Sequence, residues 1–179
     1  QSIVGLAKSG NLIFGSTTIR GGLDAPTSEM ATKPVIFVWD IAKKEKVNEI
    51  EIPFESIQQT PMISGLTFDK DGQLWGAVDG VLFTMDPETM TFTKHKDIYP
   101  DVKNRGMWRP VHIEFGADGL LYTDIAGRMT VVDPAHPDWK YTRILTDKEV
   151  DFMTLASDDT GKEAIYILQN SPQDIEKIE

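Results

Sequence analysis

The 179-residue sequence predicts an all-β chain built from four similar units. Two observations lead to this fold class. An apolar run, a polar turn with glycine and a second apolar run recur four times, around Gly10, Gly72, Gly119 and Gly161. An acidic residue closes a later apolar run in each unit, and these markers lie 46, 47 and 46 residues apart, at Asp40, Asp86, Asp133 and Glu179. Internal repetition of this kind fixes an architecture more strongly than any single local motif.

Each unit contains four expected strands in an up-and-down order. The runs on either side of the glycine turn supply two strands, and the run that ends at the acidic marker supplies a third. After the first three markers come polar turn sequences and then a fourth run, which reads VNEIEI, TFTKHKDI and WKYTRIL. The fourth unit stops at its marker, so we expect three strands there. The predicted units span residues 1–52, 61–98, 110–146 and 150–179.

The stretch FDKDGQLWGAVDG, residues 68–80, has the composition of either a calcium loop or a turn between strands. An EF-hand loop needs acidic ligands at positions 1, 3 and 5, glycine at 6 and glutamate at 12. A loop that starts at Asp69 has Gln73 at position 5, Leu74 at position 6 and Gly80 at position 12. Because the runs on both sides are also of the β type, we interpret the stretch as a turn and expect no bound metal.

The first unit carries an insertion between its second and third expected strands. The interval from the turn glycine to the acidic marker is 14 residues in the second and third units and 30 in the first. The extra 16 residues fall at about 17–33 and are rich in Gly, Thr, Ser and Pro, so we expect a long loop, with a linker as the alternative. At the same place the other two units have Asp79-Gly80 and Ala126-Gly127, which suit tight hairpin turns with positive φ.

The units that end in MDPET and VDPAHP resemble the β-propeller repeats of bacterial quinoprotein-like and NHL-like proteins. This resemblance covers nearly the whole chain and implies that each unit is one blade of a propeller. It implies no particular activity, because such propellers serve many functions. We expect a portion of a larger propeller of about six to eight blades. A four-bladed ring and a β-sandwich are the alternatives.

Composition excludes several classes of function. The formal net charge of −10 disfavours binding to nucleic acid or to an anionic membrane surface. The absence of cysteine excludes disulfides, thiolate metal sites and cysteine catalysis. No phosphate-binding glycine loop, serine elbow or zinc-protease motif occurs in the sequence. We therefore expect no cofactor and no catalytic residue within the chain. The absence of cysteine does not decide the compartment, and we expect an extracellular or cell-surface location.

Long irregular segments are predicted at one end of the units, where binding sites tend to lie. They are the insertion, residues 52–62 and residues 99–110. The ligand-binding candidates in or next to them are Arg20, Trp108, Arg109 and His112. A tryptophan beside guanidinium groups suits a sugar ring. The alternative roles are structural, with Trp108 packed between blades, Arg109 paired with a carboxylate and His112 at a loop–strand junction near Glu114.

The other aromatic and histidine residues are expected to be structural. We expect Trp39, Trp75 and Trp139 to pack within the sheets, His95 to lie on an outer strand and His136 to lie in a turn. The sequence therefore favours a binding or scaffold module of a larger bacterial protein, with a carbohydrate or a protein as the expected ligand. The alternative is part of a propeller hydrolase or lyase that other blades complete. We also expect self-association, because an incomplete propeller exposes apolar flanks on its first and last units.

Overall fold

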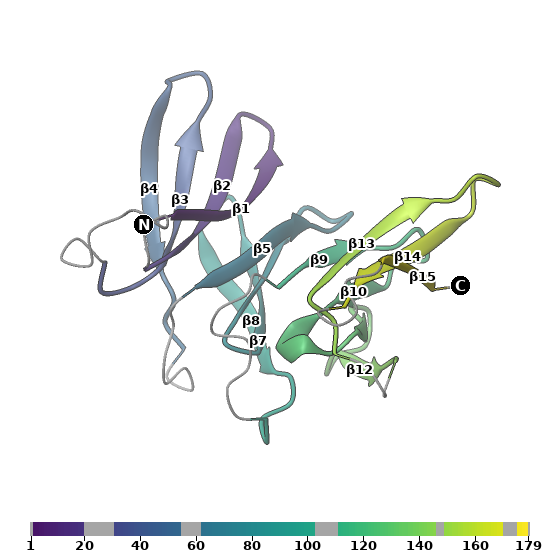
Figure 1. Cartoon of the computed structure of the whole chain (residues 1–179). Helices are drawn as coiled ribbons and strands as arrows, with labels where there is room; N and C mark the ends of the chain where they lie inside the picture. Colours follow the sequence, from purple (N-terminus) through teal and green to yellow (C-terminus); the bar gives the residue numbers. More distant parts are fainter. Residues whose placement is uncertain are drawn as a thin grey trace. The chain divides into compact units, whose positions relative to one another are not determined.

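The computed structural model describes residues 2–19, 31–54, 62–102, 111–145, 149–169 and 175–178. The chain divides into two compact units, an N-terminal unit of Gln1–Pro110 and a C-terminal unit of Val111–Glu179. Each unit contains two antiparallel sheets, and in every sheet the strand order follows the sequence (Figure 1). The prediction of an all-β chain is confirmed. No helix in the described part of the chain has the length and apolar character needed to cross a membrane.

Consecutive strands pair within all four sheets. The first sheet contains β1 (Ser2–Ser9), β2 (Leu12–Thr18), β3 (Val35–Asp40) and β4 (Glu45–Glu51). The second contains β5 (Ile63–Phe68), β6 (Leu74–Val78), β7 (Val81–Asp86) and β8 (Thr91–Asp97). The third contains β9 (Ile113–Phe115), β10 (Leu121–Thr123), β11 (Thr130–Asp133) and β12 (Lys140–Arg143). The fourth contains β13 (Phe152–Ser157), β14 (Glu163–Leu168) and β15 (Ile175–Ile178).

The acidic markers occupy equivalent positions in the first three sheets. Asp40, Asp86 and Asp133 each end the third strand and pair with the first residue of the fourth strand. In each case one carboxylate oxygen accepts the backbone N–H two residues further on, at 2.9, 2.8 and 3.0 Å. The expected register is therefore confirmed for these three markers, whereas Glu179 lies outside the described residues. The marker is acidic because its side chain closes the turn that follows.

All four predicted turn glycines have positive φ, namely +56° for Gly10, +84° for Gly72, +80° for Gly119 and +82° for Gly161. Asp79 and Gly80 also form the expected two-residue hairpin, with φ of 46° and 79° between the paired residues Val78 and Val81. A side chain with a branched Cβ adopts this conformation only with strain, which explains the glycines.

The corresponding turn of the third sheet differs from the prediction. Ala126 and Gly127 do have positive φ, at 56° and 69°, but they lie within a 3₁₀ turn, η2 (Ile125–Gly127). The last strand pair before this turn joins Thr123 to Thr130, so the connection is longer than a tight hairpin. The expectation of a tight hairpin is wrong here, because the chain leaves the ladder at Asp124.

The carboxylate of Asp69 is fully engaged by its own turn. One oxygen accepts the backbone N–H groups of Asp71 and Gln73, both at 2.9 Å, and the other accepts the indole N–H of Trp75 at 2.8 Å. In the third sheet the hydroxyl of Tyr122 donates to Asp118 at 2.8 Å, and burial together with this bond raises the pKa of Tyr122 to about 12. The stretch is therefore a repeated structural turn, and the absence of calcium binding stays a prediction.

The predicted boundary of the insertion is wrong at its start. Strand β2 continues through Thr17 and Thr18, both of which are buried. The hydroxyl of Thr17 donates to the carbonyl of Val35 at 2.9 Å and accepts the N–H of Val35 at 2.8 Å, which extends the pairing of β2 with β3 by a side chain. Residues 20–30, most of the predicted loop, lie outside the described residues.

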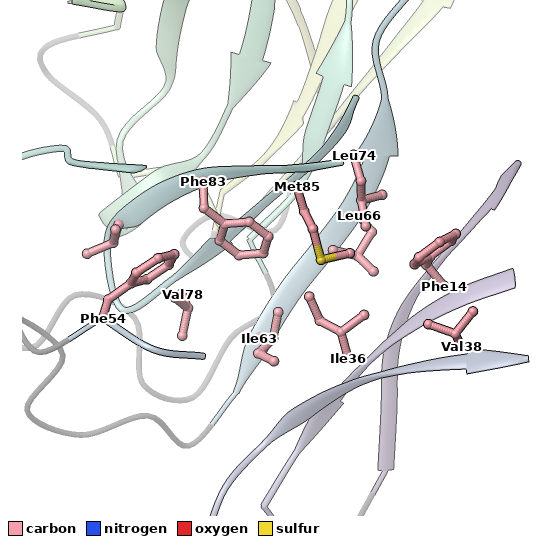
Figure 2. Close-up of a cluster of buried hydrophobic side chains, with 11 residues drawn as sticks. Phe14, Ile36, Val38, Phe54, Ile63, Leu66, Leu74, Val78, Phe83 and Met85 are labelled. Atoms are coloured by element: carbon pink, nitrogen blue, oxygen red, sulfur yellow. The ribbon is translucent and has the colours of Figure 1, made fainter. Parts of the chain in front are cut away.

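An apolar core joins the two sheets of the N-terminal unit (Figure 2). Phe14, Ile36 and Val38 of the first sheet point toward Phe83 and Met85 of the second, and all five are completely buried. The inner strands approach so closely that a Cβ atom on Gly5 would lie 2.9 Å from the Cα atom of Gly65. The Ser16 hydroxyl also donates to the Ser64 carbonyl at 2.7 Å.

The two sheets of the C-terminal unit share a smaller apolar core and two polar links. Its core cluster consists of Met129, Val150, Met153 and Ile167. Glu114 on β9 accepts the backbone N–H of Leu155 on β13 at 2.8 Å, and Glu163 on β14 accepts the N–H of Ala117 at 2.8 Å. The carboxylates thus connect the third sheet to the fourth in both directions.

The expectation for the tryptophans holds in two of three cases. Trp75 and Trp139 are buried, as predicted for residues that pack within the sheets. The prediction is wrong for Trp39, whose side chain is exposed on the first sheet. Trp39 lies next to a β-bulge at Val38, on the sheet face opposite the apolar core. The alternation of residues along the strand therefore does not place it in the core.

Candidate functional site

The repeat departs from its pattern at the inner strand of the third sheet. In the first three sheets one apolar residue of the inner strand pairs with a small residue of the second strand; the pairs are Leu6–Gly15, Leu66–Gly76 and Ile113–Thr123. The residue that precedes the apolar one is glycine in the first two sheets and His112 in the third. The residue that follows the small one is Ser16, Ala77 or Asp124. Two small residues are therefore replaced by a histidine and an aspartate.

His112 and Asp124 form a bidentate pair across the end of β9 and β10. The backbone N–H of His112 donates to Asp124 Oδ1 at 2.7 Å, and Nδ1 of the ring lies 2.7 Å from Asp124 Oδ2. The side chain of Asp124 is only 3% exposed, whereas that of His112 is 23% exposed. The buried carboxylate therefore fixes both the backbone and the ring of a partly exposed histidine.

This geometry determines which ring nitrogen is presented. A carboxylate that accepts from Nδ1–H selects the tautomer whose Nε2 carries a lone pair. Among the described residues, none makes a hydrogen bond to Nε2 of His112. Nε2 is thus an oriented acceptor in neutral histidine, and an oriented donor when the ring is protonated.

An exposed aromatic ring borders the histidine. Phe152, the first residue of β13, meets the His112 ring edge to face, with ring centroids 4.3 Å apart and an interplanar angle of 62°. Phe152 is one of the exposed large apolar side chains of the chain's described part. The third and fourth sheets therefore present a polar nitrogen and an apolar ring side by side at the end where their inner strands begin. We call His112, Asp124 and Phe152 the histidine site.

One cross-strand pair of the third sheet consists of two polar residues. In the first two sheets the matching pair is a glycine and an aromatic residue whose ring lies over it. A Cβ atom on Gly15 would lie 2.1 Å from the ring of Phe37, and one on Gly76 would lie 2.4 Å from that of Phe83. The third sheet has Thr123 and Thr130 as the matching strand pair. Thr123 is completely buried, and its hydroxyl has no hydrogen-bonding partner among the described residues. Natural proteins seldom leave such a group unpaired without a role for it.

Of the four predicted ligand-binding residues, the structure describes only His112. Arg20, Trp108 and Arg109 lie outside the described residues. Glu114, which was expected near His112, instead binds the backbone of Leu155. No group of three acidic or histidine residues suited to a metal ion occurs in the part of the chain that the structure describes.

The other two histidines have the structural places that were expected. His95 lies on β8 and stacks on Phe54, with ring centroids 4.3 Å apart. His136 lies in the turn after β11, where its Nδ1 accepts the N–H of Asp138 at 3.2 Å.

Asp124 was not predicted from the sequence. A signal for it did exist, since Asp124 follows its turn glycine by five residues, as the small residue Ala77 does in the second unit. A buried acidic residue at a position otherwise held by small residues requires a partner, and His112 supplies it.

Solved structures support the all-β architecture of the whole chain. The extracellular domain of the hybrid two-component system BT3049 from B. thetaiotaomicron matches at 13% identity and a TM-score of 0.59, over 99% of this chain and 23% of that one. The extracellular domain of the one-component system BT4673 from the same organism matches at 14% identity and a TM-score of 0.57, with the same coverage. A protein of unknown function from Desulfotomaculum acetoxidans matches at 12% identity and a TM-score of 0.50, over 99% and 55%.

These matches show a shared fold and nothing more specific. This chain spans only 23% of the length of the two extracellular domains that it resembles. Its sequence matches no protein-family model and no curated protein.

Proposed function

We propose that the chain is part of a β-propeller that serves as a non-catalytic, ligand-binding module of a larger bacterial protein. The meander order of all four sheets and the face-to-face packing of sheets within each unit support the propeller arrangement. The match to 23% of each of two longer extracellular domains is further support, because it suits a chain that forms part of a larger assembly. An extracellular or cell-surface location and the lack of nucleic-acid, membrane and cofactor partners belong to the same proposal.

The histidine site is the observation that carries the binding function. A repeat position that is glycine in the first two sheets, where the backbones nearly touch, is a partly exposed histidine in the third. Burying Asp124 costs free energy unless its oxygens are paired, and both oxygens are used to orient His112. A structural role alone would not require a partly exposed histidine ring that is held in one orientation at this place.

The ligand that fits best is a small polar molecule with one flat apolar face, such as a sugar. Nε2 of His112 would bind a hydroxyl or carboxylate, while the exposed ring of Phe152 would cover C–H groups. Arg20, Trp108 and Arg109 are proposed as ligand-binding residues on the sequence pattern alone. Their cationic groups would favour an acidic sugar on a chain with net charge −10.

The test is a glycan array probed with the wild-type chain and with His112→Ala, Asp124→Asn and Trp108→Ala, each checked by circular dichroism. We expect binding to fall at least tenfold in the first two variants. His136→Ala is the matched control, because it removes a histidine from a turn at the opposite strand ends. Equal binding by folded His112→Ala and by wild type would remove the histidine site from the proposal.

A second candidate function follows from the same pair. A carboxylate that fixes the tautomer of a histidine is also the arrangement of a general base. The chain would then be part of a hydrolase or lyase, with a nucleophile or acid supplied by residues outside it. Hydrolysis of a bound sugar or ester that disappears in Asp124→Asn, with binding retained, would favour this alternative over a binding module.

A further inference from the structure

The exposed large apolar side chains are confined to two of the four sheets. Within the described ranges they belong to the first and fourth sheets or to the turn that follows β3, and they are Ile3, Leu6, Trp39, Ile41, Val47, Phe152 and Ile175. The second and third sheets contribute none. A solvent-exposed apolar patch on particular sheets usually marks an interaction surface.

The exposed residues of the first sheet correspond to buried residues of the second. Both inner strands contain a register shift, after Ile3 in β1 and after Ile63 in β5, and both then pair a leucine with a glycine. This correspondence matches Ile3 with Ile63, Leu6 with Leu66 and Trp39 with Met85. Ile63 and Met85 are completely buried and Leu66 is 8% exposed, whereas Ile3 and Leu6 are 60% and 58% exposed.

The first and second sheets are built alike on the face that bears Leu6 in one and Leu66 in the other. Phe37 covers Gly15 on the first sheet just as Phe83 covers Gly76 on the second. On the second sheet this face packs against the first sheet and forms the core shown in Figure 2. On the first sheet the corresponding face, which we call the receiving face, has Ile3 and Leu6 exposed to solvent. The receiving face therefore has the construction of a surface that accepts another sheet of the same repeat.

The fourth sheet offers the complementary surface. Its core cluster with the third sheet uses Met153 and Ile167, so alternate residues point to the other side. Thr154 and Tyr166 are paired on that side, and Ile175 next to them is 78% exposed. Counting from the turn, Thr154 and Tyr166 match Gly5 and Ser16, which contact the second sheet in the N-terminal unit. We call this side the docking face.

We infer that, where no neighbouring blade of the larger propeller proposed above covers these faces, a second copy of this chain binds head to tail, with the docking face of its β13–β15 sheet on the receiving face of the β1–β4 sheet. The chain supplies one face of each kind, and no other described sheet exposes large apolar side chains. The contact reproduces one that the molecule already makes between its first and second sheets. It is a heterologous contact, so that each copy uses a different surface.

Sedimentation velocity of the full chain over a hundredfold concentration range tests the contact. We expect reversible association in the wild type and at least a tenfold rise of the dissociation constant in Leu6→Lys. Val47→Lys is the matched control, because Val47 is also exposed on the first sheet but corresponds to Thr93, which stays exposed on the covered second sheet. A monomeric wild type, or equal weakening by both variants, would overturn the inference.

Disulfide trapping tests which faces meet, and it does not depend on the stability of a lysine variant. The chain has no cysteine, so single cysteines can be placed without background. An equimolar mixture of Leu6→Cys and Thr154→Cys should form a mixed dimer under mild oxidation, whereas Leu6→Cys with Lys70→Cys, in an exposed turn, should not. Dimers of Leu6→Cys with itself that form as readily as the mixed dimer would show an isologous contact and would overturn the head-to-tail arrangement.

Discussion

The two units differ in the side-chain contacts that pack their sheets against each other. In the N-terminal unit the facing sheets meet through aromatic and aliphatic side chains, and Gly5 brings the inner backbones nearly into contact with Gly65. In the C-terminal unit the apolar cluster is smaller, and Glu114 and Glu163 bind backbone N–H groups of the facing sheet. The difference teaches that a repeat can keep its strand order while exchanging apolar contact for polar links. The polar junction is also the one that holds the histidine site.

The largest effect is expected from the apolar junction. Phe83→Ala removes a completely buried ring that contacts Phe54 and Phe92, so it should lower the free energy of unfolding by about 3–5 kcal/mol. Hydrogen exchange should show the loss in the strands of the N-terminal unit. Val47→Ala, at an exposed position, should change the stability by less than about 0.5 kcal/mol. A small loss for Phe83→Ala would mean that the apolar junction does not stabilise this unit.

The polar junction should respond to the loss of an acceptor. Glu114→Ala leaves the N–H of Leu155 without its partner in a half-buried position, and we expect a loss of about 1–3 kcal/mol, located by hydrogen exchange in β13. Glu114→Gln keeps an acceptor oxygen and should lose less than the alanine variant. Equal losses in the two variants would show that packing, and not the hydrogen bond, is what Glu114 contributes.

The turn glycines should behave alike in both units, because the turn is the same. Gly72→Val and Gly119→Val should each lose about 1 kcal/mol or more, since φ is +84° and +80° at these positions. A Cβ atom at either position would meet no atom within 4 Å, so the loss would come from backbone conformation alone. Gly72→Asn should be milder, because asparagine tolerates positive φ. Urea unfolding would measure all three, and a neutral Gly72→Val would contradict the assigned turn.

The smallest expected effect is a loss of stability at acidic pH. Hydrogen bonds from Lys177 and Thr160 hold the pKa of Asp158 well below its usual range, and backbone N–H groups lower the pKa of Asp40 and Asp86. A carboxylate with a lowered folded-state pKa stabilises the protein above its unfolded pKa and loses this contribution as pH falls. Both units should therefore lose stability below about pH 4. Thermal melts of Asp158→Asn should show a flatter pH dependence, and an unchanged profile would exclude this carboxylate as a contributor.

The positions of the strands and turns could be predicted because they depend on local sequence. Asp40, Asp86 and Asp133 mark strand ends, since each closes the turn beside it. The turn glycines were identifiable for the same reason, because positive φ is a property of a single residue. Neither feature requires knowledge of which sheets meet.

The predictions that were wrong and the features that were missed depend on contacts between residues far apart in the chain. The exposure of Trp39 reflects which face of its sheet is covered, and periodicity alone does not reveal this. Asp124 pairs with a residue twelve positions away, and Glu114 with one 41 positions away. Of the predicted ligand-binding residues, the structure describes only His112. Its partner Asp124, which orients the ring, was identified from the fold.

The strand order within the sheets has a consequence for how the chain folds. Every ladder between the described strands joins two that are consecutive in the sequence, so most pairings close short loops and lose little chain entropy. Pairing between consecutive strands favours fast formation of each sheet, since hairpins form on a timescale of about 1–10 μs. Each sheet would serve as a nucleus to which its neighbour is added, as in other repeat proteins. The slowest step expected in the chain is therefore the joining of one sheet to the next, and mutations at the junctions should alter folding rates more than mutations in the turns.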